Sequence, residues 1–173
     1  MTEQAYLPMF GITGVELKGA DCNANGLPDG WECANGFDPN FAPDALADAD
    51  EDGLPNLYEF HHGTDPWLED SERVPKIVAG GTGGNSAPTL AAALAMATPY
   101  SVVEVADGVH QGGGWGDIHL PEFPVVVTSA DQGRSRKATI RSTDDLSVFY
   151  LSSTQTTHTV VQGLRIELAA TGG

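Results

Sequence analysis

The feature that most constrains the fold of this chain is an acidic twelve-residue pattern that occurs twice. The first copy, DCNANGLPDGWE, begins at Asp21, and the second, DADEDGLPNLYE, begins at Asp48. Each has carboxylate or amide side chains at positions one, three and five, glycine at six and glutamate at twelve. The match continues downstream, where Gly36-Phe-Asp-Pro recurs as Gly63-Thr-Asp-Pro, so equivalent residues stand 27 positions apart. A register held over this length is an internal repeat.

The spacing within each copy is that of a calcium loop, D-x-[DN]-x-[DN]-G-x5-E. Calcium takes roughly six to eight oxygen ligands, and such a loop supplies side chains at one, three and five. The glycine allows a sharp bend, position seven adds a carbonyl, and the glutamate closes the shell with both oxygens. The predicted ligands of the first site are Asp21, Asn23, Asn25, the Leu27 carbonyl, Asp29 and Glu32. Those of the second are Asp48, Asp50, Asp52, the Leu54 carbonyl, Asn56 and Glu59.

Carboxylate number ranks the two predicted sites. The first contains three carboxylates and the second contains four, so we expect the second loop to bind calcium more tightly. Solvated acidic turns without a metal are the alternative interpretation of each loop. Two copies in the same register favour the metal.

Each loop leads into a short predicted helix that ends at a glycine, Gly36 or Gly63. In the second copy, Pro55 stands in the first turn of this helix. Asp38 and Asp65, in the Gly-x-Asp-Pro elbows, are expected to cap turns, with metal ligation as the alternative. The adjacent pair His61 and His62 points to different sides of a helix, which favours a solvated pair over a transition-metal site.

Two cysteines, Cys22 and Cys33, flank the first loop. Their spacing suits a local disulfide, and two free thiols are the alternative that the sequence leaves open.

The repeats, over residues 20–70, resemble bacterial thrombospondin type 3 repeats, which are calcium-rich spacers of secreted and cell-surface proteins. The resemblance rests on the acidic loop, the Leu-Pro step, the closing glutamate and the Gly-x-Asp-Pro elbow. It implies Ca²⁺ as the cofactor and an extracellular or cell-surface location. Dockerin modules also carry paired calcium loops, but they usually place an apolar residue at position eight and aspartate at twelve. A dockerin-like, partner-binding module is therefore the weaker alternative.

Charge divides the chain into two parts. Residues 1–75 carry 16 acidic and 2 basic side chains, whereas residues 76–173 carry 8 and 6. We expect an N-terminal segment at 1–20, the repeats at 21–70, a linker at 71–78 and a second domain at 76–173. Such acidity argues against nucleic acid and anionic membrane surfaces as partners. No apolar stretch is long enough for membrane insertion, and the first 20 residues lack the features of a signal peptide.

The second domain is predicted to be mainly β. A helix is expected at 88–96, followed by a strand at 101–105 that breaks at Asp107-Gly108. Further short runs rich in Val, Ile and Thr follow without helices between them, which argues against a βαβ sheet. These runs are residues 118–120, 124–128, 138–141, 148–151, 157–161 and 164–168.

The glycine-rich lead, the Ala/Leu helix and SVVEVADGVHQG resemble the entry of a right-handed parallel β-helix of the pectate-lyase-like class. The resemblance covers residues 76–173 and implies an N-terminal cap helix followed by about three coils; a compact β-sandwich is the alternative. The expected inward residues are Val103, Val105, Val125, Val127, Ile140, Val148, Tyr150, Val160, Leu164 and Ile166. An open end near residues 171–173 would invite self-association, or continue into further coils of a longer protein.

No catalytic constellation is recognised in the second domain, so an enzymatic activity is not expected of this chain. The basic loop DQGRSRK at 131–137 is read as a solvated loop, with contact to an acidic polysaccharide as the alternative. The leading functional hypothesis is a calcium-rigidified structural module for adhesion, display or filament assembly. The rival is a non-catalytic N-terminal part of a polysaccharide lyase or hydrolase.

Overall fold

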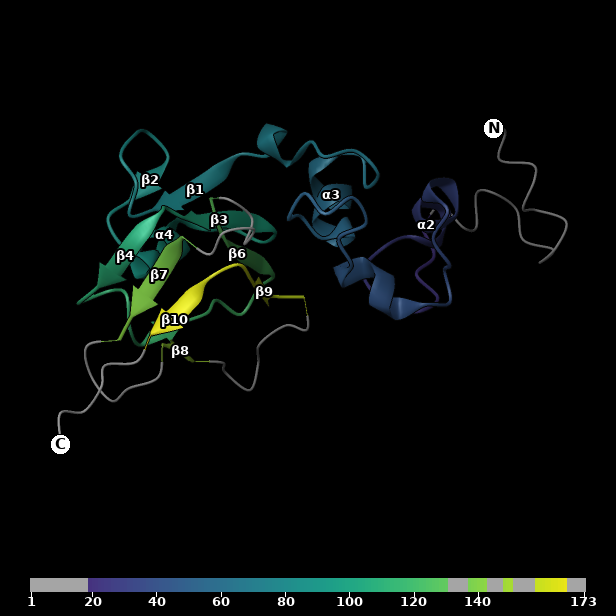
Figure 1. Cartoon of the computed structure of the whole chain (residues 1–173). Coiled ribbons are helices and arrows are strands. Elements are labelled where there is room, and N and C mark those ends of the chain that lie inside the picture. Colours follow the sequence, from purple (N-terminus) through teal and green to yellow (C-terminus); the bar gives the residue numbers. More distant parts are fainter. Residues whose placement is uncertain (1–18, 131–136, 143–147, 151–157, 168–173) are drawn as a thin grey trace, which may run out of the picture. The chain divides into compact units, whose positions relative to one another are not determined.

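The computed structural model describes residues 19–130, 137–142, 148–150 and 158–167 (Figure 1). The chain divides into two compact units, Met1–Arg73 and Val74–Gly173. The division falls inside the segment 71–78, where the charge distribution placed a linker. The expected N-terminal segment 1–20 lies outside the described residues except for its last two.

The first unit contains short helices that follow the acidic loops. They are α2 (Asp29–Asn35), η3 (Ala42–Leu46), α3 (Asn56–His62) and η4 (Ser71–Arg73). Helices α2 and α3 end at Gly36 and Gly63, with φ of 83° and 73°, a left-handed conformation that glycine adopts at little cost. The next N–H bonds back to the carbonyl of Glu32 or Glu59, at 2.8 Å and 3.1 Å. The two repeats therefore share one helix-ending motif.

Aromatic rings connect the two repeats of the first unit. The Trp31 ring stacks on Phe37 at a centroid distance of 5.7 Å and meets Phe60 of the second repeat edge-on at 5.6 Å. Trp67 continues the stack on Phe37 at 5.2 Å and donates its indole N–H to the Asn35 carbonyl. Because rings from both repeats pack together, each repeat supports the other through apolar contact.

The second unit consists of short strands and one helix, and every strand pairing among its described residues is parallel. The elements are β1 (Lys76–Ala79), β2 (Ser86–Ala87), α4 (Leu90–Met96), β3 (Ser101–Val105), β4 (Gly108–Gln111), β5 (Ile118–His119), β6 (Val125–Ser129), β7 (Ala138–Arg141), β8 (Phe149–Tyr150), β9 (Val160–Val161) and β10 (Arg165–Glu167). With ten strands and three α-helices, the described part of the chain is mainly β, as predicted.

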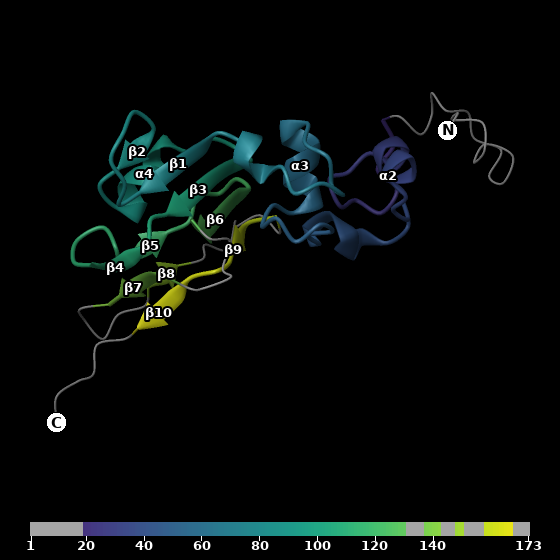
Figure 2. The same cartoon turned by 45° about the horizontal axis from the view of Figure 1, so that its top comes forward.

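The strands form three sheets, and the chain visits them in a fixed order. The sheets have the strand orders β2-β1-β3-β6-β9, β10-β7-β4 and β5-β8. The chain passes through β3, β4 and β5, then through β6, β7 and β8, and then through β9 and β10. The strands of each pass pair with the equivalent strands of the previous pass. Val103 of β3 pairs with Val127 of β6, and His110 of β4 pairs with Ile140 of β7. Figure 2 shows β4, β7 and β10 lying side by side.

The core of the second unit lies between these sheets and α4. Thr89 caps α4 by accepting a hydrogen bond from the Ala92 N–H, and Leu90, Ala93 and Leu94 are buried. The helix contacts β1, β2, β3 and β5. Six expected inward residues are confirmed as buried: Val103, Val105, Val125, Val127, Ile140 and Val148. Val160 and Leu164 are half-buried.

The predicted burial is wrong for two of the expected inward residues, Tyr150 and Ile166. Tyr150 is 37% exposed because its ring stacks on His119 of the neighbouring strand at 5.1 Å rather than entering the core. Ile166 is 43% exposed and belongs to β10, an edge strand of its three-stranded sheet. Residues Gly108–Gln111 form strand β4, whereas the sequence predicts a break at Asp107-Gly108. Its pairing with β7 makes it a strand although its side chains are largely exposed.

We also compared the helices with the length and hydrophobicity that a membrane span requires. In the part of the chain that the structure describes, every helix is too short or too polar for a membrane span.

Candidate metal centre

The aspartate at position one organises each acidic loop. Its two carboxylate oxygens accept hydrogen bonds from the backbone N–H groups at positions five and six. In the first loop, Asn25 N lies 3.0 Å from Asp21 Oδ1 and Gly26 N lies 3.0 Å from Asp21 Oδ2. In the second, Asp52 N lies 3.1 Å from Asp48 Oδ1 and Gly53 N lies 2.8 Å from Asp48 Oδ2. The loops are thus closed by the same local bonds.

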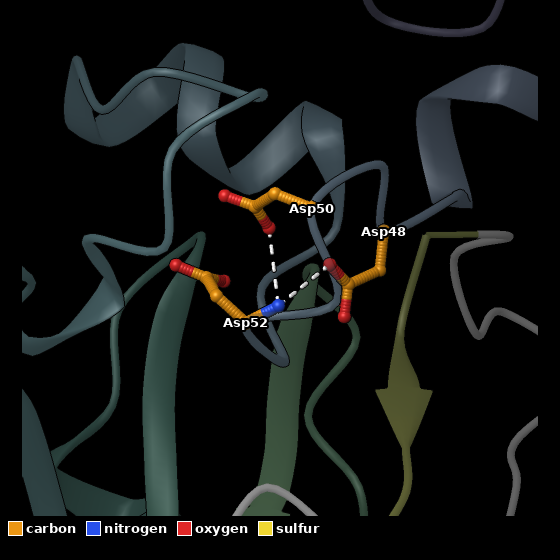
Figure 3. A group of neighbouring side chains, drawn as sticks. All are labelled: Asp48, Asp50 and Asp52. Atoms are coloured by element: carbon orange, nitrogen blue, oxygen red, sulfur yellow. Dashed lines mark hydrogen bonds between the residues drawn. The ribbon is translucent and has the colours of Figure 1, made fainter.

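Positions three and five continue this pattern. Asp50 Oδ1 accepts from Asp52 N at 3.0 Å (Figure 3). Asp52 Oδ1 accepts from Leu54 N at 3.0 Å. The first loop repeats these bonds, from Asn25 N to Asn23 Oδ1 at 3.0 Å and from Leu27 N to Asn25 Oδ1 at 2.8 Å. The side chains at one, three and five therefore converge on the inside of each loop.

The backbone of each loop is left-handed at two positions. The glycine at position six has φ of 92° in the first loop and 90° in the second, which explains why glycine stands there. Position four is also left-handed, with φ of 56° at Ala24 and 64° at Glu51. Nothing in the sequence pattern indicated this second bend.

The second loop gathers a dense group of carboxylates. Ligand oxygens of Asp48, Asp50 and Asp52 lie within 4.8 Å of one another, and so do those of Asp52, Glu59 and Asp70. Asp52, Glu59 and Asp70 are all buried. Four buried carboxylate oxygens have no hydrogen-bond partner: Asp50 Oδ2, Glu59 Oε1, Glu59 Oε2 and Asp70 Oδ1. A buried unpaired carboxylate is strongly unfavourable, so this arrangement suits a bound cation.

Burial and mutual repulsion also perturb the acid–base equilibria of this group. Desolvation, followed by the charges of Asp50 and Asp52, raises the pKa of Glu59 from 4.5 to about 8. The Thr64 hydroxyl offsets part of this rise without reaching hydrogen-bond geometry. Desolvation likewise raises the pKa of Asp50 from 3.8 to about 6. Shifts in this direction show that the site resists several negative charges unless a positive charge joins them.

The first loop balances its carboxylates differently. Glu32 is fully buried, and its Oε1 accepts from Asn23 Nδ2 and Asn25 Nδ2, both at 3.0 Å, while Oε2 has no partner. Asn25 Nδ2 also donates to Asp44 Oδ1 at 3.1 Å. Desolvation raises the pKa of both Glu32 and Asp44. Amide donors thus compensate part of the acidity here, whereas the second loop has carboxylates at the corresponding positions.

Positions seven and nine serve the local structure. The Leu27 and Leu54 side chains are buried, at 0% and 2% exposed. Asp29, at position nine, accepts a hydrogen bond from the Cys22 N–H at 2.8 Å. Its counterpart Asn56 donates from Nδ2 to the Asp44 carbonyl at 2.8 Å and leaves a buried Oδ1 without a partner. Asp29 therefore points to the start of its own loop, and Asn56 connects the second loop to η3.

Sequence reasoning missed two acidic residues that the fold brings to the loops. Asp44 reaches the first loop through Asn25, and Asp70 joins Asp52 and Glu59 in the second. Neither belongs to the twelve-residue pattern, and no glycine follows Asp70 at the place that the pattern requires. The one available signal was an acidic residue at a similar distance after each closing glutamate.

The disulfide predicted between Cys22 and Cys33 is not formed, and both residues are free thiols. Cys22 is exposed and Cys33 is half-buried in α2. The nearby Asp29 carboxylate raises the pKa of the Cys22 thiol.

The elbow aspartates cap turns, as expected. Asp38 Oδ1 accepts from Asn40 N at 3.0 Å, and Asp65 Oδ1 accepts from Trp67 N at 3.1 Å. His61 and His62 lie in the last turn of α3, where positive charge is favoured by the helix dipole. The His61 ring meets Phe60 edge-on at 5.1 Å.

Charged groups in the second unit form ion pairs along neighbouring strands. Lys76 Nζ lies 3.3 Å from Glu104 Oε2, and both Arg141 and Arg165 pair with Glu167. Within the described residues, the acidic groups suited to a metal all belong to the first unit. Residues 131–136 of the basic loop lie outside the described residues.

In comparisons with known proteins, no family model, no curated protein and no solved structure matches this chain. The assignment of function therefore rests on the geometry of the loops.

Proposed function

We propose that the first unit is a calcium-binding module in which each acidic loop holds one ion. The observation that carries this proposal is the group of buried carboxylate oxygens without hydrogen-bond partners in the second loop, centred on Glu59. A cation would supply the missing partners and offset the repulsion that raises the pKa of Glu59 to about 8.

The ligand chemistry favours calcium over other metals. The side chains that converge in the loops are carboxylates and amides, which are hard oxygen ligands suited to calcium or magnesium. Magnesium keeps several water molecules and demands a compact octahedral shell. A loop that offers several protein oxygens, including both oxygens of Glu59, suits the larger and more flexible shell of calcium.

For the second unit, we propose a right-handed parallel β-helix that begins at β1 and has α4 as its cap. Three observations support it: parallel pairing throughout, repeated passage through three sheets in one order, and the contact of α4 with the first strands. The stacked passes give an elongated scaffold whose length grows with the number of coils.

Together, these features support a structural role in a secreted or cell-surface protein, in adhesion, display or filament assembly. Calcium loops of extracellular modules bind at about 0.1–1 mM, a range in which the ion serves to stabilise structure. An acidic calcium module followed in the chain by a stacked β scaffold suits a structural spacer.

Calorimetric titration of the chelator-treated chain with calcium tests the metal proposal. We expect one ion per loop, counted independently by native mass spectrometry. With a Kd of about 0.1 mM, about 10 mM calcium would stabilise each loop by about 2.7 kcal/mol. Magnesium at the same concentration serves as the matched control and should produce a smaller shift in melting temperature. A titration without heat, together with an unchanged melting curve, would overturn the proposal.

A further inference from the structure

Asp70 lies outside the second acidic loop in sequence but is attached to it in the fold. Its backbone N–H donates to Asp52 Oδ2 at 2.9 Å, and the N–H of Ser71 donates to the same oxygen at 2.6 Å. The Ser71 hydroxyl also donates to the Asp52 carbonyl at 3.0 Å. The start of η4 is therefore held against position five of the loop by three hydrogen bonds.

The two carboxylate oxygens of Asp70 have different surroundings. Oδ2 accepts a hydrogen bond from Arg73 Nη1 at 2.9 Å, whereas Oδ1 is buried without a partner. The residue is 3% exposed, and it offers an oxygen within 4.8 Å of ligand oxygens of Asp52 and Glu59. Both oxygens of Glu59 are also buried and unpaired. Two unpaired carboxylates in such proximity repel each other unless a cation lies between them.

The hydrogen bonds of Asp52 indicate that one ion, rather than two, occupies this group. Asp52 Oδ2 already accepts two N–H bonds, and Oδ1 accepts one from Leu54 N. A carboxylate has about four lone-pair positions, so Asp52 retains about one for a metal. It can therefore ligate one ion but not bridge two, and a single ion shared by the loop, Asp70 and Glu59 would give partners to their unpaired oxygens.

We propose that Asp70 is a ligand of the second calcium ion, supplied through Oδ1 from outside the loop while Oδ2 remains paired with Arg73. This inference rests on the proposed calcium function and extends it. Because Asp70 begins the segment that ends the first unit, calcium would fix residues 70–73 against the loop. Binding at the second loop would then protect the chain at the boundary between the units.

Asp44 provides a matched control. It too is a buried aspartate from outside a loop, but its Oδ1 is covered by the Asn25 amide at 3.1 Å. Its carboxylate meets the first loop, whereas Asn56 of the second loop bonds to its backbone carbonyl, so replacement of the carboxylate should leave the second site unchanged. The variants Asp70→Asn and Asp44→Asn remove the same charge and keep the same shape.

The test measures calcium affinity by calorimetry in full-length chains carrying Glu32→Gln, which disables the first loop. In this background we expect one bound ion, an affinity loss of about 10- to 100-fold on adding Asp70→Asn, and a change below about threefold on adding Asp44→Asn. Equal affinity with and without Asp70→Asn would overturn the ligand assignment alone. If the wild-type chain binds no calcium, the proposed function fails as well.

Trypsin provides a second readout that does not depend on affinity. Arg73 is the one lysine or arginine in the described range 19–73, and its side chain is 70% exposed. At a calcium concentration of about ten times the wild-type Kd, we expect calcium to slow cleavage after Arg73 by about tenfold in the wild type and by at most about twofold in Asp70→Asn. Each variant is compared with itself with and without calcium, because the substitution also alters the Arg73 ion pair. Equal protection in both proteins would contradict the inference.

Discussion

Replacing Glu59 by glutamine removes one charge from the second loop and nearly preserves the shape of the side chain. In the folded protein, burial and the neighbouring aspartates raise the pKa of this carboxyl group from 4.5 to about 8. Its ionised form is therefore disfavoured by the fold and would be favoured by a bound cation. We expect Glu59→Gln to stabilise the protein in chelator, and we expect calcium to reduce this stabilisation.

The pKa shift sets the size of the effect in chelator. A tenfold change in a protonation equilibrium corresponds to about 1.4 kcal/mol, so the rise from 4.5 to about 8 amounts to on the order of 5 kcal/mol. Because the folded protein holds this proton more tightly than the unfolded chain, the stabilisation is complete below pH 4.5 and is lost as the pH rises through about 8. Asp50, with a pKa raised to about 6, adds a loss in the same direction at lower pH.

In calcium the difference becomes smaller. The wild-type loop gains about 2.7 kcal/mol at a calcium concentration of about 100 times its Kd, and the glutamine variant loses most of this gain. Near pH 8 the variant should thus be more stable than the wild type in chelator, and calcium should reduce this difference by most of that amount. A purely structural role for Glu59 would give the same difference in both conditions.

The assay is urea denaturation at about pH 5 and about pH 8, in chelator and in about 10 mM calcium. Tryptophan fluorescence reports on the first unit through Trp31 and Trp67, whereas Trp115 reports on the second unit. An equal stability difference between Glu59→Gln and the wild type in chelator and in calcium would refute metal ligation by this residue. A wild-type stability in chelator that rises between these pH values would refute the electrostatic argument.

Two further predictions concern other parts of the chain. Leu90→Ala removes most of a fully buried side chain on α4 and should destabilise the second unit by about 2–5 kcal/mol. This loss of stability should be the same with and without calcium, and a calcium-dependent loss would contradict the division into two units. Alkylation of the unfolded chain without reductant should modify both Cys22 and Cys33. If mass spectrometry finds neither cysteine modified, the two are joined by the disulfide that the sequence predicts.

The sequence by itself predicted the elements whose geometry depends on near neighbours. The convergence of positions one, three and five follows from hydrogen bonds within a few residues, such as Asp52 N to Asp48 Oδ1. The glycines at Gly36 and Gly63 likewise indicated where α2 and α3 end, because the left-handed conformation is a local property. Strands β3 and β7 were predicted with their observed bounds, since their apolar β-branched residues form continuous runs.

Tertiary structure decided what depends on residues distant in the chain. Asp70 meets Asp52 across 18 positions, a contact that no spacing rule encodes. The exposure of Tyr150 and Ile166 depends on which strand lies beside each, and β4 is a strand because β7 supplies its hydrogen-bond partners. A local pattern specifies a turn or a helix cap because the backbone groups that it needs are nearby in the chain. The residues that surround a buried charge, and the face of a strand that becomes buried, are determined only when distant segments pack together.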